Sequence, residues 1–206
     1  MKFPYYKPLG YPQGMYRVGP LARLNVAVQM GTPRAEKEFK EFRQRGKHHG
    51  VVHESFHFHL ARLIEMLAAL ERIERLFEDP DLMRADVRSH ARLNEEEGIG
   101  SCEAPRGVLF HHYKVDSQGL VTQANLLIAT SQNNLAINRA VEQAARRYVK
   151  QGQPPETREG MLNRVEASIR CFDPCLSCST HALGQMPLMV EARGPQEELL
   201  WQVERG

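Results

Sequence analysis

The chain has 206 residues, enough for one sizeable hydrophobic core. Its 27 lysines and arginines nearly balance its 25 aspartates and glutamates, so overall charge gives no reason to expect a nucleic acid or an anionic membrane as partner. No window approaches the roughly eighteen unbroken apolar residues of a membrane span, and no secretory signal is evident at the start, so we expect a cytoplasmic protein.

The first 33 residues are irregular. Frequent prolines and glycines exclude a long element there and leave only 21–30 as a short helix. The many tyrosines of this stretch suggest that it lies on another surface. Residues 34–49 mix charges with Phe39 and Phe42 three positions apart, which predicts a solvated helix with a narrow apolar edge.

The strongest periodic pattern runs over residues 56–78. Its spacings of three and four predict a long helix suited to a bundle, with a broad buried stripe of Leu60, Ile64, Leu67, Leu70, Ile73 and Phe77. We expect Ser55 to cap the start of this helix. Three histidines lie at its head, but only His53 and His57 have the i, i+4 spacing, so a histidine metal site is a weak hypothesis.

The second half of the chain alternates between helical and extended patterns. Residues 81–100 are predicted to form a short polar helix that ends in a glycine-rich turn. Residues 108–113 and 120–130 indicate two strands of an antiparallel hairpin. Residues 131–150 predict a helix, and 161–169 a last turn or two of helix. The expected fold is therefore mainly α, a helical bundle with a small antiparallel β-hairpin.

Three of the four cysteines cluster near the end of the chain and are followed by a histidine, giving Cys171, Cys175, Cys178 and His181. Clustered cysteines of this kind indicate reduced metal ligands better than a disulfide framework. Two thiolates at i and i+3, after an Asp-Pro turn, can point their sulfurs at one soft transition ion. Metal chemistry is therefore expected.

Two common kinds of metal site share part of this pattern. The cluster could be a structural zinc site, although four ligands within eleven residues would have to wrap one loop around the ion, whereas zinc sites usually join two separated pairs. The Cys-x3-Cys-x2-Cys spacing also resembles the cluster motif of radical S-adenosylmethionine enzymes. That motif stands early, ahead of a long barrel, whereas only 28 residues follow Cys178 here.

Taken whole, the stretch Asp173-Pro174-Cys175-Leu176-Ser177-Cys178-Ser179-Thr180-His181 resembles the C-terminal metal-binding motif of the large subunit of nickel-iron hydrogenases. Residues 103–107 (Glu-Ala-Pro-Arg-Gly) and 129–134 resemble two further segments of that family. Residues 4–25 look most like the soluble, bidirectional, NAD-reducing branch. The resemblance covers nearly the whole chain and implies the fold of the hydrogenase large subunit.

The resemblance implies a role for each metal ligand. Cys175 would be a terminal nickel ligand, Cys178 would bridge nickel and iron, and His181 would bind a magnesium ion beneath a nickel-iron centre that carries carbon monoxide and cyanide. The family's other two thiolates come from an N-terminal Cys-x2-Cys motif that this chain does not contain.

The resemblance also implies which other side chains act at the centre. Arg106 would stand over its open side with Asp173 as carboxylate partner, and Ser131 would donate to a cyanide. A thiolate or a poised arginine can accept the proton released when H2 is split. Cys102 and Cys171 match no ligand of the family and are expected to be small buried residues.

By resemblance, the chain is an oxidoreductase fragment that supports reversible H2 oxidation and proton reduction by heterolytic cleavage. Its expected partners are the N-terminal half of the large subunit, a small iron-sulfur subunit, and a flavin (FMN) module that reduces NAD. No phosphate-cradling glycine loop occurs here, so NAD would bind another subunit. Nickel-insertion chaperones and a maturation endopeptidase are further expected partners.

Two domains follow from this interpretation. Residues 1–181 are expected to be the C-terminal part of the large-subunit domain, and 182–206 a cleavable extension removed after His181. A plain terminal strand and helix is the alternative for 182–206. For the whole chain, the alternatives are a truncated non-catalytic remnant or interaction module, and a small zinc-binding domain.

Overall fold

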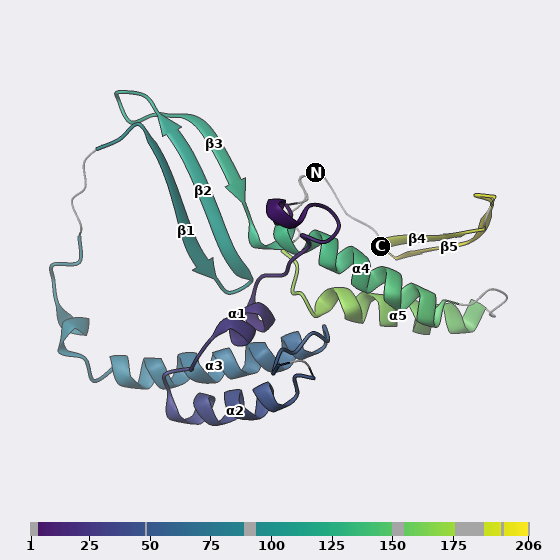
Figure 1. Ribbon diagram of the computed structural model, residues 1–206, viewed down its shortest axis with the longest axis horizontal. Coiled ribbons are helices and arrows are strands. Elements are labelled where there is room, and N and C mark those ends of the chain that lie inside the picture. Colours follow the sequence, from purple (N-terminus) through teal and green to yellow (C-terminus); the bar gives the residue numbers. More distant parts are fainter. Residues whose placement is uncertain are drawn as a thin grey trace. The chain divides into compact units, whose positions relative to one another are not determined.

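The computed structural model describes residues 4–47, 49–88, 94–149, 155–175, 188–194 and 196–205. The chain divides into two units, Met1–Cys175 and Leu176–Gly206. Figure 1 shows their elements. Within the described ranges, no helix is both long enough and apolar enough to cross a membrane.

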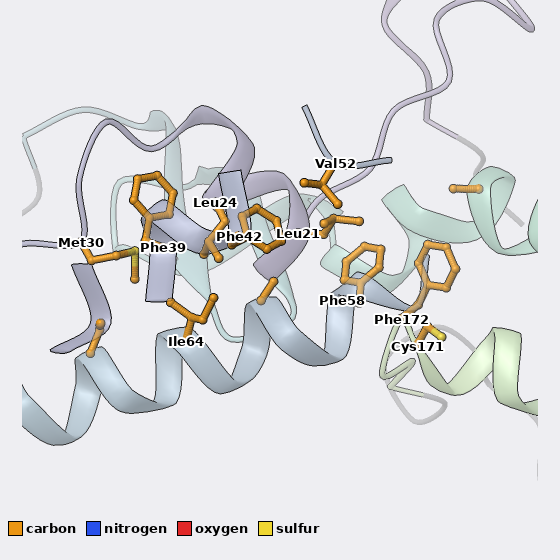
Figure 2. Close-up of a cluster of buried hydrophobic side chains, with 14 residues drawn as sticks. Leu21, Leu24, Met30, Phe39, Phe42, Val52, Phe58, Ile64, Cys171 and Phe172 are labelled. Carbon is orange, nitrogen blue, oxygen red and sulfur yellow. The ribbon is translucent and has the colours of Figure 1, made fainter. Parts of the chain in front are cut away.

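Three helices build the first half of the larger unit. After a short 3-10 turn, η1 (Lys7–Leu9), these are α1 (Pro20–Val26), α2 (Pro33–Gln44) and α3 (His57–Leu76). Proline is the first residue of both α1 and α2, a position whose N–H has no partner within the helix. Both helices pack on α3, and the side chains between them form the main core (Figure 2). The narrow apolar edge predicted for α2 is present, since Phe39 and Phe42 are buried.

The buried face of α3 differs from the predicted stripe. The long helix is confirmed, but its buried residues are Phe58, Ala61, Ile64, Ala68 and Glu71. Only Ile64 belongs to both sets. The small Ala61 and Ala68 let neighbouring helices approach closely, and this packing decides which apolar residues of the helix face inward. The prediction for Ser55 was also wrong, because the cap residue is Phe56 and no side chain caps the helix.

A three-stranded antiparallel sheet follows α3 and a second 3-10 turn, η2 (Pro80–Met83). Its strands β1 (Glu97–Ala104), β2 (Gly107–Val115) and β3 (Val121–Leu127) lie in the order β1-β2-β3. The predicted hairpin corresponds to β2 and β3. The predicted polar helix over 81–100 was wrong. Among its described residues, only 81–83 are helical, as part of η2, and residues 97–100 begin β1 (Figure 1).

Two helices complete the larger unit and contact each other. They are α4 (Ala129–Tyr148) and α5 (Pro155–Arg170). Helix α5 is longer than the predicted 161–169, because Pro155 is its first residue. The smaller unit holds one antiparallel hairpin, β4 (Leu188–Arg193) with β5 (Leu199–Arg205). The terminal helix that the sequence offered as an alternative is wrong for the described residues 199–205, which form β5. The mainly helical fold class is confirmed.

Candidate metal centre

Arg106 and Asp173 form the centre of the candidate site. Arg106 lies in the tight turn between β1 and β2, while Asp173 follows the end of α5 with a left-handed φ of 48°, which aspartate tolerates. The Arg106 Nε–H donates to the Asp173 carbonyl at 2.8 Å, and the Asp173 carboxylate Oδ2 lies 3.0 Å from the same nitrogen. Both side chains are about half exposed. The pair joins the β1–β2 turn to the segment that leads into Cys175.

Backbone packing fixes the turn that carries Arg106. A Cβ on Gly19 would lie 2.7 Å from the Arg106 carbonyl oxygen, and one on Gly107 would lie 2.4 Å from Val18 Cγ2. Both glycines also have left-handed φ values, 99° and 139°. The segment before α1 and the β1–β2 turn can therefore pack backbone to backbone only because neither position has a side chain.

The first turn of α4 ties three distant segments together through buried polar side chains. The Gln132 carboxamide accepts from the Tyr16 hydroxyl at 2.9 Å and donates to the Val108 carbonyl at 2.6 Å. The Asn133 side chain accepts from the Val18 amide at 2.9 Å and donates to the Val18 carbonyl at 3.2 Å. The side-chain amide of Asn133 thus bonds both the N–H and the C=O of Val18, as a neighbouring strand would. These residues hold segment 16–18 and β2 against α4.

Thr130 positions the candidate nickel ligand. Its hydroxyl oxygen accepts the Cys175 backbone N–H at 3.0 Å, and the side chain is buried. The neighbouring Ser131 hydroxyl donates to the Ile128 carbonyl at 2.8 Å, at the start of the same helix. The single hydroxyl proton would have to leave this bond for Ser131 to donate to a cyanide, and that role stays a prediction.

The residues before Asp173 are anchored in the core (Figure 2). The Phe172 ring lies 4.8 Å from the Phe58 ring, centroid to centroid, at the start of α3. Cys171 is fully buried, its thiol donates to the Ala167 carbonyl, and burial raises the pKa of that thiol. A thiol in this state is a packing group, as expected. Cys102 was expected to be buried too, but it is exposed on β1.

Arg23 is a polar residue of the site that the sequence did not single out. From α1 its guanidinium reaches Glu65 on α3 and Glu103 at the end of β1. It also donates to the carbonyls of Ala104 and Pro105, at 2.9 and 2.8 Å. Burial alone would lower the pKa of Arg23, but the bonds and charges of the two glutamates outweigh it and raise that pKa. Only the folded chain reveals this residue, since its partners are up to 82 positions away.

The metal ligands themselves are only partly described. Of the three predicted ligands, Cys175 is described, while Cys178 and His181 lie outside the described residues. Considering the described residues alone, no group of three or more His, Cys, Asp or Glu side chains could hold a metal ion. The roles of Cys175, Cys178 and His181 therefore stay predictions.

The histidines at the head of α3 have separate partners. The His53 ring faces the Arg17 guanidinium at 3.4 Å, and the His59 ring faces the Arg62 guanidinium at 3.3 Å. Permanent positive charge at this distance repels a metal cation. This arrangement speaks against a histidine metal site, which the sequence supported only weakly.

Comparison with known proteins identifies the class. The model of the nickel-dependent hydrogenase family matches residues 1–181. The chain therefore belongs to that family, and its fold is that of the nickel-iron hydrogenase large subunit.

Individual relatives refine the comparison. The chain is 46% identical over 194 residues to the NAD-reducing hydrogenase HoxS subunit beta of Cupriavidus necator, covering 92% of this chain and 39% of that protein. It is 44% identical over 185 residues to an F420-non-reducing hydrogenase polypeptide of Methanothermobacter thermautotrophicus, covering 89% of this chain and 38% of that protein. The chain thus spans about two fifths of the length of these relatives.

A solved structure agrees in fold. The crystal structure of an NAD+-reducing [NiFe]-hydrogenase in the H2-reduced state matches with a TM-score of 0.78 and 43% identity, over 88% of this chain and 39% of that one. The resemblance to the NAD-reducing branch, drawn from the motifs, is confirmed.

Proposed function

We propose that this chain forms part of the catalytic large subunit of a nickel-iron hydrogenase that oxidises H2 and reduces protons reversibly. The observation that carries the proposal is the Arg106–Asp173 pair, which main chain and side chain hold together and whose Asp173 lies two residues before Cys175. Similarity to an NAD-reducing hydrogenase subunit over 92% of the chain supports the same assignment.

The donor chemistry fits a soft transition metal. Thiolates are preferred ligands of such ions, and Thr130 accepts the Cys175 backbone N–H. Cys175 is disulfide-bonded in the structure, so the proposed centre requires its reduced thiolate. Cys175 and Cys178 would then supply two of four thiolates to a nickel-iron centre with carbon monoxide and cyanide ligands, Ser131 would donate to a cyanide, and His181 would bind magnesium. When bound, such a centre supplies the activation of H2 for heterolytic cleavage.

The side chains of this chain would manage the proton. The Arg106 guanidinium would stand over the open side of the centre, oriented by Asp173. The Asp173 carboxylate holds the guanidinium in orientation and offers an acceptor for a proton at its oxygens. The thiolate of Cys175 is the second acceptor within the proposal.

The proposal implies partners, because this chain would supply only two of the four thiolates. The remaining large-subunit polypeptide would provide the other two thiolates, and an iron-sulfur subunit would carry electrons to a flavin module and NAD in the cytoplasm. The apolar face that α3 leaves exposed, with Leu63 at 61% and Leu70 at 58%, supports a large polypeptide partner. Nickel-insertion chaperones and an endopeptidase acting after His181 would complete maturation.

The test is to co-produce the chain anaerobically in a nickel-replete host with the complementary large-subunit polypeptide and the iron-sulfur subunit from the same genome. We expect nickel in the complex, iron in excess of what the iron-sulfur subunit holds by itself, and H2-dependent dye reduction. Nickel and activity should be lost in Cys178→Ser and kept in the exposed control Cys102→Ser. Stoichiometric zinc would instead indicate the zinc module, and a complex without nickel or zinc the non-catalytic remnant. Intact mass of the matured chain tests removal of 182–206.

A further inference from the structure

The guanidinium of Arg23 has every donor occupied. Its five N–H groups meet five acceptors: Nε and Nη2 each donate to one Glu65 carboxylate oxygen at 2.6 Å, Nη1 donates to Glu103 and to the Ala104 carbonyl, and Nη2 also donates to the Pro105 carbonyl. A planar fork used completely allows one orientation only. Arg23 is therefore a rigid bracket between α3 and the end of β1.

We propose that Arg23 is a positioning residue for Arg106, and this inference rests on the proposed function. Arg23 binds the three residues that immediately precede Arg106, so it sets where the β1–β2 turn begins. The turn continues into Gly107, whose backbone packs against Val18. Arg106 thus leaves a turn fixed on both sides, and Asp173 holds only its head group.

The geometry requires arginine at position 23. A lysine ammonium has three donors on a flexible stem, so it can replace at most three of the five bonds. It also lacks the planar pair of N–H groups that makes two parallel bonds to Glu65. Arg23→Lys keeps the charge and loses the bracket. Arg43 provides a matched control: its guanidinium also holds α1, through the Asn25 carbonyl at 2.7 Å, but it does not bind residues 103–105.

Hydrogen exchange on the full 206-residue chain tests the bracket directly. In Arg23→Lys, we expect the amides of Glu103, Ala104, Arg106 and Gly107 to exchange about tenfold faster, with exchange in α4 and α5 unchanged. Arg43→Lys should leave these amides unchanged. Glu103→Gln, a milder change, should give a smaller increase at the same amides. Unchanged exchange at 103–107 would overturn the inference, and so would an equal increase throughout the chain, which indicates a merely structural residue.

The assembled enzyme gives the functional readout. At equal nickel content, we expect Arg23→Lys to lower kcat for H2-dependent dye reduction about tenfold and to change the KM for H2 much less. Full kcat in a variant with accelerated exchange would also overturn the inference. If the unaltered complex binds no nickel, the proposed function fails, while the exchange result still decides whether Arg23 fixes the turn.

Discussion

One nitrogen of Arg106, Nε, faces two oxygens of Asp173: the backbone carbonyl at 2.8 Å and the carboxylate at 3.0 Å. The carbonyl bond does not depend on the side chain of Asp173. Removing the carboxylate charge should therefore leave Arg106 near its position while changing the electrostatics around it.

This separation makes Asp173→Asn a test of chemistry at constant geometry. We expect H2-dependent dye reduction per nickel to fall about a hundredfold, the usual scale of a lost acid–base group, with nickel content unchanged. The exposed Asp81→Asn serves as control. Equal activity in both variants would remove Asp173 from the mechanism.

Thr130 should matter for the order of the metal-binding segment. Thr130→Val keeps the shape of the side chain but removes the oxygen that accepts the Cys175 N–H. We expect a loss of about 1 kcal/mol in the free energy of unfolding, the typical net worth of one hydrogen bond. Urea unfolding measures it, and Thr130→Ser, which keeps the acceptor, should retain most of the stability. The idea fails if serine and valine have the same effect.

Glu71 should make the stability of the chain depend on pH. Its buried carboxylate accepts the backbone N–H groups of Arg34 and Ala35, both at 2.9 Å, at the start of α2. Burial alone would raise the pKa of Glu71, but these bonds outweigh it and lower the pKa. The stabilisation is therefore complete above the ordinary pKa of glutamate, about 4.3, and is lost as pH falls through the lower folded value.

Urea unfolding at several pH values measures this effect. Glu71→Gln should be less stable than the unaltered chain at pH 7, and the difference should shrink as the pH falls below about 4. Glu74→Gln, exposed on the same helix, is the control and should behave like the unaltered chain. A stability difference that is the same at every pH would contradict the role of the charge.

The exposed face of α3 should bind the complementary large-subunit polypeptide. Leu63→Gln and Leu70→Gln remove apolar surface that the chain itself leaves exposed, so its own unfolding midpoint should change little. Recovery of the complex on affinity purification should drop several-fold. Leu120→Gln, at a loop position with 62% exposure, is the matched control. Undiminished recovery with both α3 variants would place the partner elsewhere.

The sequence predicted where helices lie better than it predicted which side of each helix is buried. The period of three and four in α3 is strong, but its apolar residues cover more than one face, and the approach of α1 and α2 over Ala61 and Ala68 selects the buried side. β1 was missed because glutamates and glycines hide its extended character. Pairing with β2 stabilises it, for example where Glu97 meets His112 at 2.7 Å.

Some residues of the candidate site could be found from the sequence, and others could not. Motif resemblance led to Arg106 and Asp173, because a short run of residues carries each of them. Arg23, Gln132 and Asn133 lie within segments that carry the resemblance, but their partners are far away in the chain and a local pattern does not identify them. Their importance becomes visible only when the backbone carbonyls they bind are known.

The bonds that join α4 to the N-terminal segment also bear on how the chain folds as it is made. Tyr16 and Val18 find their partners 116 and 115 residues later, in Gln132 and Asn133. Contacts of such high contact order form slowly, because a long loop must close first. On the ribosome, the segment before α1 stays without these partners until α4 has been synthesised. We therefore expect the packing of segment 16–18 against α4 to be among the last parts of the fold to form.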